Sequence, residues 1–215
     1  MGLYIGNTRY CPVLQKTENV PYDAKVECLH SDGAAYIDTG INCQNIGKVE
    51  CVLRYPEAPG INHADGAIGT SFYSSTGVAT VSGTTTPYYW CAQFGDGGTE
   101  ILSSTTINAN TFFHTIVLDI NNGTVTFDNG TPVSITVTSN PPSMNWWLFV
   151  RNGRLNRQYP SERRTVRIWN KSGVLVRDYV AVRSNGVGYM YDKVSNTLFG
   201  NDNSTGVFTY GSDLT

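Results

Sequence analysis

Several stretches of the chain alternate apolar and polar residues with a period of two, most clearly residues 48–55, 165–170 and 174–182. A period of two places successive side chains on opposite faces of a strand, so each stretch predicts a half-buried β-strand. The four valines of residues 174–182 share one phase, which predicts that they form the buried face of that strand. No long stretch combines helical spacing with good helix formers, and we therefore predict an all-β chain.

Turn signals separate the predicted strands. Asn-Gly pairs at residues 122–123 and 129–130 predict tight turns, and residues 170–173 predict another. Together with the alternating stretches, these turns predict roughly a dozen short strands at the spacing of a β-sandwich. One sandwich accommodates all 215 residues and buries a sizeable core.

Charge and cysteine content limit the classes of function and the cellular compartment that the sequence suggests. Charged residues make up 15% of the chain and the formal net charge is −2, which disfavours binding to nucleic acid or to an anionic membrane. The five cysteines form no CxxC pair, and the first residues do not resemble a signal peptide. We therefore expect reduced thiols, a chain that folds in a reducing cytoplasm, and no membrane insertion.

Two stretches carry a family resemblance. Residues 173–201, GVLVRDYVAVRSNGVGYMYDKVSNTLFGN, resemble the C-terminal signature of concanavalin A-like, LamG-type jelly-roll domains, and residues 35–41, AYIDTGI, resemble the opening strand of that family. They occur in the family's order, and weaker agreements extend the resemblance from Tyr22 to Phe208. The resemblance implies a jelly-roll sandwich of two antiparallel sheets. Such domains are common in proteins of Bacteroidales bacteria and their phages.

We divide the chain into an N-terminal arm, residues 1–21, and a lectin-like jelly-roll domain, residues 22–215. The arm is too short to bury its own apolar side chains, so these need a partner surface. Two interpretations remain open, namely an edge strand folded onto the domain and an arm that docks on another protein. The residues concerned are Tyr4, Ile5, Tyr10, Val13 and Leu14.

No arrangement of catalytic groups is evident. A retaining glycosidase on this fold needs two carboxylates close together, whereas the four glutamates at positions 50, 57, 100 and 162 are isolated. The three histidines lie far apart, and no GxSxG motif occurs. We therefore predict that the chain is not an enzyme.

We predict no cofactor and no metal site. Calcium is an alternative, because aspartates in predicted loops offer the oxygen ligands that it prefers. Aspartate in a turn usually accepts hydrogen bonds from its own backbone, which is the simpler interpretation. The aspartates concerned are Asp65, Asp96, Asp128 and Asp202.

Aromatic side chains are the candidates for binding a sugar, because the C–H face of a sugar ring packs on them. Of the neighbours Trp146 and Trp147, one is expected in the core, since successive strand residues face opposite ways. The candidate glycan-binding residues are Tyr73, Tyr88, Tyr89, Trp90 and Tyr159.

Five arginines cluster between residues 151 and 164, along one predicted connection. Two interpretations remain open, namely a solvated loop and a loop at a protein interface. The second is considered because arginine and tyrosine are favoured in protein contacts. The candidate interface residues here are Arg157, Arg163 and Arg164.

The resemblance and these patterns predict a non-enzymatic phage virion protein, either a head fibre, a capsid decoration protein or a tail-fibre subunit. It would be made in the bacterial host cytoplasm and would carry a lectin-like domain for a host-surface glycan. We expect a homo-oligomer, a trimer by analogy with fibre proteins, joined to other virion proteins through the arm. The alternative is a bacterial carbohydrate-binding module or surface lectin.

Overall fold

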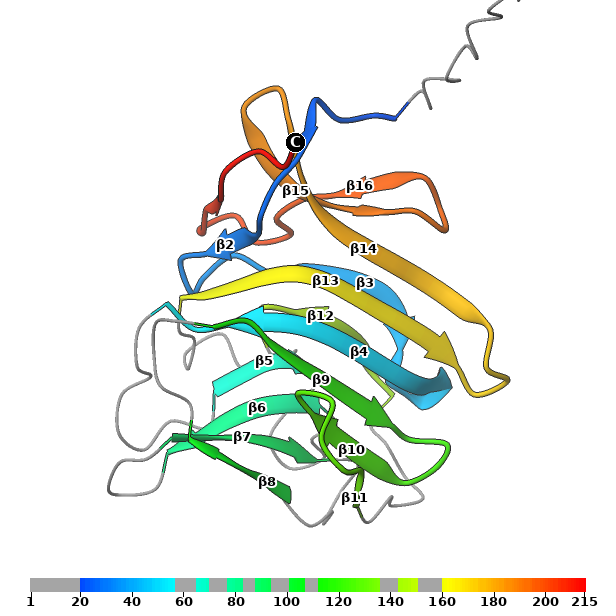
Figure 1. The fold of residues 1–215 in the computed structure, drawn as a ribbon. Helices are drawn as coiled ribbons and strands as arrows, with labels where there is room; N and C mark the ends of the chain where they lie inside the picture. The colour runs from blue at the N-terminus through cyan, green and yellow to red at the C-terminus, as the bar shows by residue number, and fades with distance from the viewer. Residues whose placement is uncertain are drawn as a thin grey trace, which may run out of the picture.

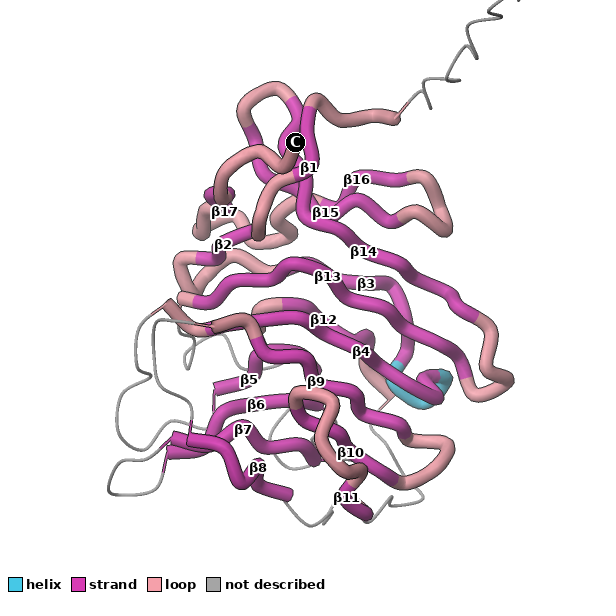
Figure 2. The backbone as a smooth tube through the Cα atoms, viewed as in Figure 1, coloured by secondary structure: helices cyan, strands magenta, loops and turns pink. Residues whose placement is uncertain are grey.

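The computed structural model describes residues 20–56, 65–69, 77–82, 88–93, 101–106, 112–135, 143–150 and 160–215, with the backbone alone for the four ranges between 65 and 106. The described residues are almost entirely strands and turns, and the one helical element is a short 3-10 turn, η1 (Cys43–Asn45) (Figure 2). The predicted all-β class is confirmed.

The strands form two antiparallel sheets, and Figure 1 shows the larger one in front of the smaller. The larger sheet has the order β11-β10-β9-β4-β13-β14-β15-β16, with β1 paired to β14 and with β2 joining β13 to β17. Its strands are β1 (Ala24–Lys25), β2 (Leu29–Ser31), β4 (Ile46–Arg54), β9 (His114–Asp119), β10 (Thr124–Phe127), β11 (Val133–Ser134), β13 (Ser161–Asn170), β14 (Leu175–Ser184), β15 (Val187–Asp192), β16 (Thr197–Phe199) and β17 (Phe208–Tyr210).

The smaller sheet has the order β3-β12-β5-β6-β7-β8, so β3 forms one of its edges. Its strands are β3 (Ile37–Asn42), β5 (Asp65–Gly69), β6 (Gly77–Ser82), β7 (Tyr88–Gln93), β8 (Ile101–Thr106) and β12 (Asn145–Leu148). Two stacked antiparallel sheets of this size are consistent with a β-sandwich.

Both sheets contribute to one hydrophobic core. β4 contributes Val49, Cys51 and Leu53, all at most 1% exposed, and β12 contributes Trp146 and Leu148 from the opposite sheet. The alternation predicted for residues 48–55 and 165–170 is confirmed, because their apolar positions are the buried ones. Of the two neighbouring tryptophans, Trp146 is the one in the core.

The predicted face of β14 is only partly correct. Val182 is fully buried, as the pattern predicts, whereas Val174, just before the strand, is 57% exposed. Tyr179 and Ala181, in the opposite phase, are also buried in the core. The Tyr179 ring packs edge-on against Phe199, with centroids 5.3 Å apart. A tyrosine fills more of the core than a valine does, which favours burial of this phase.

The predicted turns are confirmed. Asn170 closes the β13–β14 turn by accepting hydrogen bonds from the N–H groups of Ser172 and Val174. Asp128 and Asn129 have φ values of 48° and 59°, a conformation that aspartate and asparagine tolerate better than most residues. Short polar side chains can bond locally to the backbone, which is why these sequences form turns.

The two ends of the described domain lie side by side, as Figure 2 shows near β1. Val26 forms a β-bridge with Asp213, and the N–H of Leu214 donates to the carbonyl of Lys25 at 2.8 Å. Residues 1–19, and with them the predicted arm, lie outside the described residues.

Candidate functional site

The predicted sugar-binding aromatics are only partly covered by the structure. Tyr88, Tyr89 and Trp90 lie in β7, within the smaller sheet, and their side chains are not among the described ones. Tyr73 and Tyr159 lie outside the described residues. These assignments stay predictions.

The arginine cluster is divided by the start of β13. The prediction that Arg163 lies on an exposed connection is wrong, because β13 begins at Ser161 and Arg163 has no exposed surface. Its Cα partners in the neighbouring strands are Leu29 and Leu53, so it lies in the inward phase. Its guanidinium lies 5.0 Å from the centre of the Phe149 ring. Burial lowers the pKa of Arg163 below the usual arginine range.

Arg164, the next residue of β13, is partly exposed, because successive residues of a strand face opposite sides. Its guanidinium pairs with Glu27 at 3.2 Å and lies 4.0 Å from the centre of the Phe113 ring. Its side chain is 42% exposed, so it stays available for contact with another chain. Arg157 and the five apolar arm residues lie outside the described residues.

The two stretches that carry the family resemblance meet in space. The side chain of Asn201 accepts from the N–H of Tyr36 at 3.1 Å, and that of Asp202 accepts from the N–H of Asp38 at 2.7 Å. The N–H of Asp202 in turn donates to the carbonyl of Tyr36 at 2.9 Å. These bonds occupy the edge of the smaller sheet, which protects an otherwise open strand.

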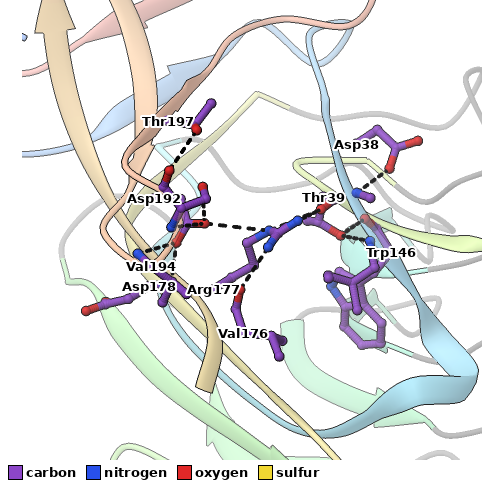
Figure 3. Close-up of polar contacts among 12 residues, drawn as sticks. Asp38, Thr39, Trp146, Val176, Arg177, Asp178, Asp192, Val194 and Thr197 are labelled. Atoms are coloured by element: carbon purple, nitrogen blue, oxygen red, sulfur yellow. Dashed lines mark hydrogen bonds and ion pairs between the residues drawn. The ribbon is translucent and has the colours of Figure 1, made fainter. Parts of the chain in front are cut away.

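A second connection between these stretches surrounds Asp192, which is fully buried (Figure 3). Its carboxylate accepts from the N–H groups of Asp178, Val194 and Ser195, and pairs with the Arg177 guanidinium at 3.7 Å. Arg177 also donates to the carbonyl of Thr39 at 3.0 Å, across from β14 to β3. The motif residues therefore join the two sheets, so their occurrence is explained by the fold without a ligand.

The partly exposed face of β3 and β12 carries an aromatic pair. The rings of Tyr36 and Trp147 stack with centroids 4.0 Å apart and planes 7° apart, and both residues are half-buried. Trp147 is the Cα partner of Asp38, whereas its neighbours Trp146 and Leu148 face the core. Alternation along β12 thus places Trp147 on the opposite face from Trp146 and Leu148, where the Trp147 side chain still packs against the core in part. We call this pair the aromatic platform.

Polar groups surround the aromatic platform. Asn145 donates its side-chain amide to Asp38 at 3.2 Å, and Asp202 is exposed. Partial burial raises the pKa of the Tyr36 phenol, and the neighbouring charges of Asp202 and Asp38 raise it further. The phenol therefore stays protonated at neutral pH and can donate a hydrogen bond, while the two carboxylates can accept them.

A second polar cluster lies on the larger sheet around Glu162. Its carboxylate bonds to Arg54, lies 3.5 Å from His30, and accepts from the Cys28 thiol at 3.5 Å. Burial and the charge of Glu162 raise the pKa of Cys28 to about 12, so the thiol is not a nucleophile at neutral pH. This cluster contains Cys, His and Glu side chains, but its main contact is the ion pair between Glu162 and Arg54, to which we assign a structural role.

The described residues contain no group of three or more His, Cys, Asp or Glu side chains able to hold a metal ion. Asp128, a calcium alternative, bonds to His114 at 2.6 Å and to the N–H of Thr115 at 2.9 Å. Asp202 accepts from the backbone, as described above. The side chains of Asp65 and Asp96 are not described.

No family model and no curated protein matches the chain. Among the described residues, no helix is long and apolar enough to span a membrane. The candidate site is therefore the aromatic platform, with Asp38, Asn145 and Asp202 around it. Sequence reasoning missed Tyr36 because it lies inside a motif that was assigned to the fold. For Trp147, the available signal was its position next to Trp146, because neighbouring strand residues face opposite sides and only one of the two was expected in the core.

Proposed function

We propose that this chain is a non-enzymatic attachment protein whose concanavalin A-like jelly roll binds a saccharide on a host surface. The observation that carries the proposal is the aromatic platform, which holds two half-buried, stacked rings beside two carboxylates and an amide. A sugar ring places its C–H face on an aromatic ring and directs its hydroxyls to such polar groups.

The protein's place is a phage virion, as a head-fibre, capsid-decoration or tail-fibre subunit. The resemblance of residues 35–41 and 173–201 to jelly-roll domains of Bacteroidales phages supports this placement. The alternative is a bacterial carbohydrate-binding module or surface lectin, which would use the same platform. Mass spectrometry of purified virions separates the two, because a bacterial lectin would be absent from the particles.

Replacing Trp147 with Ala is expected to weaken saccharide binding at least about tenfold, which corresponds to about 1.4 kcal/mol. The substitution removes the larger ring of the platform, whereas Trp147→Phe keeps an aromatic face and should retain most of the affinity. A glycan array selects the saccharide, and isothermal titration measures its affinity for each variant.

The matched control is Phe112→Ala, which removes a 73% exposed aromatic ring at the start of β9. Its affinity should equal that of the unsubstituted protein. Equal affinity of Trp147→Ala and Phe112→Ala would place the binding site elsewhere, since both variants remove one ring. Thermal unfolding of each variant checks that the fold is retained.

The chain also forms a homotrimer in this proposal, joined to other virion proteins through residues 1–21. Arg164 contributes a partly exposed guanidinium to the contact, whereas the burial of Arg163 removes it from the surface. Charges at an interface rim give register and specificity, and apolar arm residues supply most of the association energy.

Deleting residues 1–19 is expected to leave the domain folded and to abolish both trimerisation and incorporation into particles. The described strands begin only at Ala24, and the described core lies between the two sheets that follow. Light scattering gives the absolute mass of both forms at several protein concentrations, and virion composition gives incorporation. A full-length protein that is monomeric at every concentration, or a truncated one that unfolds, would contradict this prediction.

A further inference from the structure

Three turns meet at one end of the sandwich, which we call the loop end: η1 with the start of β4, the β9–β10 turn, and the β13–β14 turn. The carbonyl of Gly47 accepts from the N–H groups of Ile120 and Asn121 at 2.8 and 3.0 Å. The N–H of Lys171 donates to the carbonyl of Asn45 at 3.0 Å, and its carbonyl accepts from the Asn121 amide at 3.1 Å. The turns therefore hold one another in place.

Gly47 lies where these turns approach most closely. A Cβ atom at this position would clash with the backbone carbonyl of Asn170, whose carbon would lie 2.9 Å away, closer than real Cβ contacts come. The absence of a side chain is thus a requirement of the junction, and the loop end is preformed in the isolated chain. A preformed surface loses little entropy on binding a ligand.

The loop end contains a hollow of about 440 Å³ between the end of β3 and the β13–β14 turn. This volume lies within the range of small-ligand sites. Ile41 and Val176 supply apolar surface, and the remaining lining is polar. The lining residues are Gly40, Ile41, Asn42, Asn45, Asn170, Lys171, Ser172 and Val176.

The polar groups of the hollow divide into those that hold the turns and those that face outward. The side-chain oxygens of Asn42 and Asn170 accept backbone N–H groups, so they are occupied. Asn45, Lys171 and Ser172 are exposed, and their side chains offer an amide, an ammonium and a hydroxyl. The described lining contains one cation and no carboxylate.

Neighbouring charges do not cancel the Lys171 charge. Arg177, whose guanidinium lies 3.8 Å from where a Gly40 Cβ would be, is neutralised by the buried Asp192. On the other side of the turn, Asp119 bonds to Asn122, and Lys48 lies over the Trp169 ring at 3.9 Å. The nearest carboxylate, that of Asp38, accepts from the N–H of Gly40 at 2.8 Å and from the Asn145 amide, so Lys171 is the charged group that the described lining itself offers to a ligand.

We propose that the loop-end hollow is a second saccharide site, specific for a sugar that carries a carboxylate. The carboxylate pairs with Lys171, the ring lies against Ile41 and Val176, and Asn45 and Ser172 bond to hydroxyls. The site adjoins the aromatic platform, because the Asp38 carboxylate accepts from the N–H of Gly40 at 2.8 Å, but neither Trp147 nor Tyr36 lines the hollow.

The test uses tetragalacturonate and its carboxyl-reduced counterpart, the galactose tetramer, titrated into the full-length protein. The unsubstituted protein should bind the acidic tetramer at least about tenfold more tightly, and the difference should shrink as salt rises. Lys171→Gln should abolish the preference for the acidic tetramer. Asn45→Asp should weaken binding of the acidic tetramer, because the introduced carboxylate repels it. Trp147→Ala should still bind the acidic tetramer more tightly than the neutral one, because Lys171 is present in that variant.

The matched control is Lys25→Gln, which removes an exposed lysine on β1, beside Val182 at the far end of β14. It should keep the preference for the acidic tetramer. Equal affinity for both tetramers, no binding of the acidic tetramer, or equal effects of Lys171→Gln and Lys25→Gln would each overturn the proposal. The melting temperatures of the Lys171, Asn45 and Lys25 variants should agree, because these three side chains are exposed.

Discussion

Replacing Asp192 with Ala is expected to lower the free energy of unfolding by about 3–5 kcal/mol, the usual cost of breaking a buried ion pair. The carboxylate has no exposed surface and accepts from three backbone N–H groups, the Ser195 hydroxyl and the Arg177 guanidinium. Alanine would leave these donors without their acceptor at the buried position that the carboxylate occupies. Urea denaturation at neutral pH measures the loss.

The control for Asp192 is Asp178→Ala, one residue before Tyr179 on the outward side of β14. Asp178 pairs with Arg167 and Lys193 at 3.3 Å each, and both cations are more than 40% exposed. Such surface pairs contribute about 0–1 kcal/mol, so this variant should remain close to the unsubstituted protein. Comparable losses of unfolding free energy in the two variants would show that the buried contacts of Asp192 stabilise the fold no more than the surface pairs of Asp178 do.

Replacing Glu162 with Gln is expected to destabilise the fold at neutral pH by about 1–3 kcal/mol and to flatten its acid dependence. Burial opposes ionisation of Glu162, but hydrogen bonds from His30 and Arg54 and the charge of Arg54 outweigh it and lower its pKa to about 2. Glutamine cannot carry the charge that Arg54 faces, so the Arg54 guanidinium loses its counterion.

The sign of the pH dependence follows from that lowered pKa. The unfolded chain takes up a proton at Glu162 near pH 4.5, whereas the folded protein resists protonation until about pH 2. The stabilisation by Glu162 is therefore complete above about pH 4.5 and is lost progressively as the pH falls towards 2. Unfolding free energies across this range should fall more steeply for the unsubstituted protein than for Glu162→Gln.

Glu50→Gln is the matched control for this prediction, because Glu50 is a glutamate on β4 that pairs with the partly exposed Arg167 at 3.1 Å. It should change the neutral stability by less than about 1 kcal/mol and should retain the steep acid slope. An acid slope that is unchanged in Glu162→Gln would instead assign the pH dependence to other carboxylates.

Local chemistry was readable from the sequence. The alternation of residues 48–55 and 165–170 determined which side chains of β4 and β13 reach the core, because strand geometry alone sets that period. The turn at Asn170 followed equally from local hydrogen bonding. An all-β chain and its hairpins are properties of neighbouring residues, which is why pattern and turn chemistry predicted them.

The same local reasoning was incomplete where contacts with other strands decide which side chains are buried. On β14, Val182 is buried as the pattern predicts, but Tyr179 in the opposite phase is buried as well and packs against Phe199. Arg163 is charged, so sequence placed it in solvent. The register of β13 with Leu29 and Leu53 nevertheless places it between the sheets, over the Phe149 ring.

The sequence by itself thus determined the strands, the turns and the all-β class of this protein, since each depends on residues a few positions apart. Tertiary structure alone decided the candidate sites. Tyr36 and Trp147 come from strands far apart in the chain and form a platform only because β3 and β12 pair. The loop-end hollow likewise exists only where β3 meets the β13–β14 turn. Contacts of this kind depend on the packing of the sheets, which no local pattern encodes.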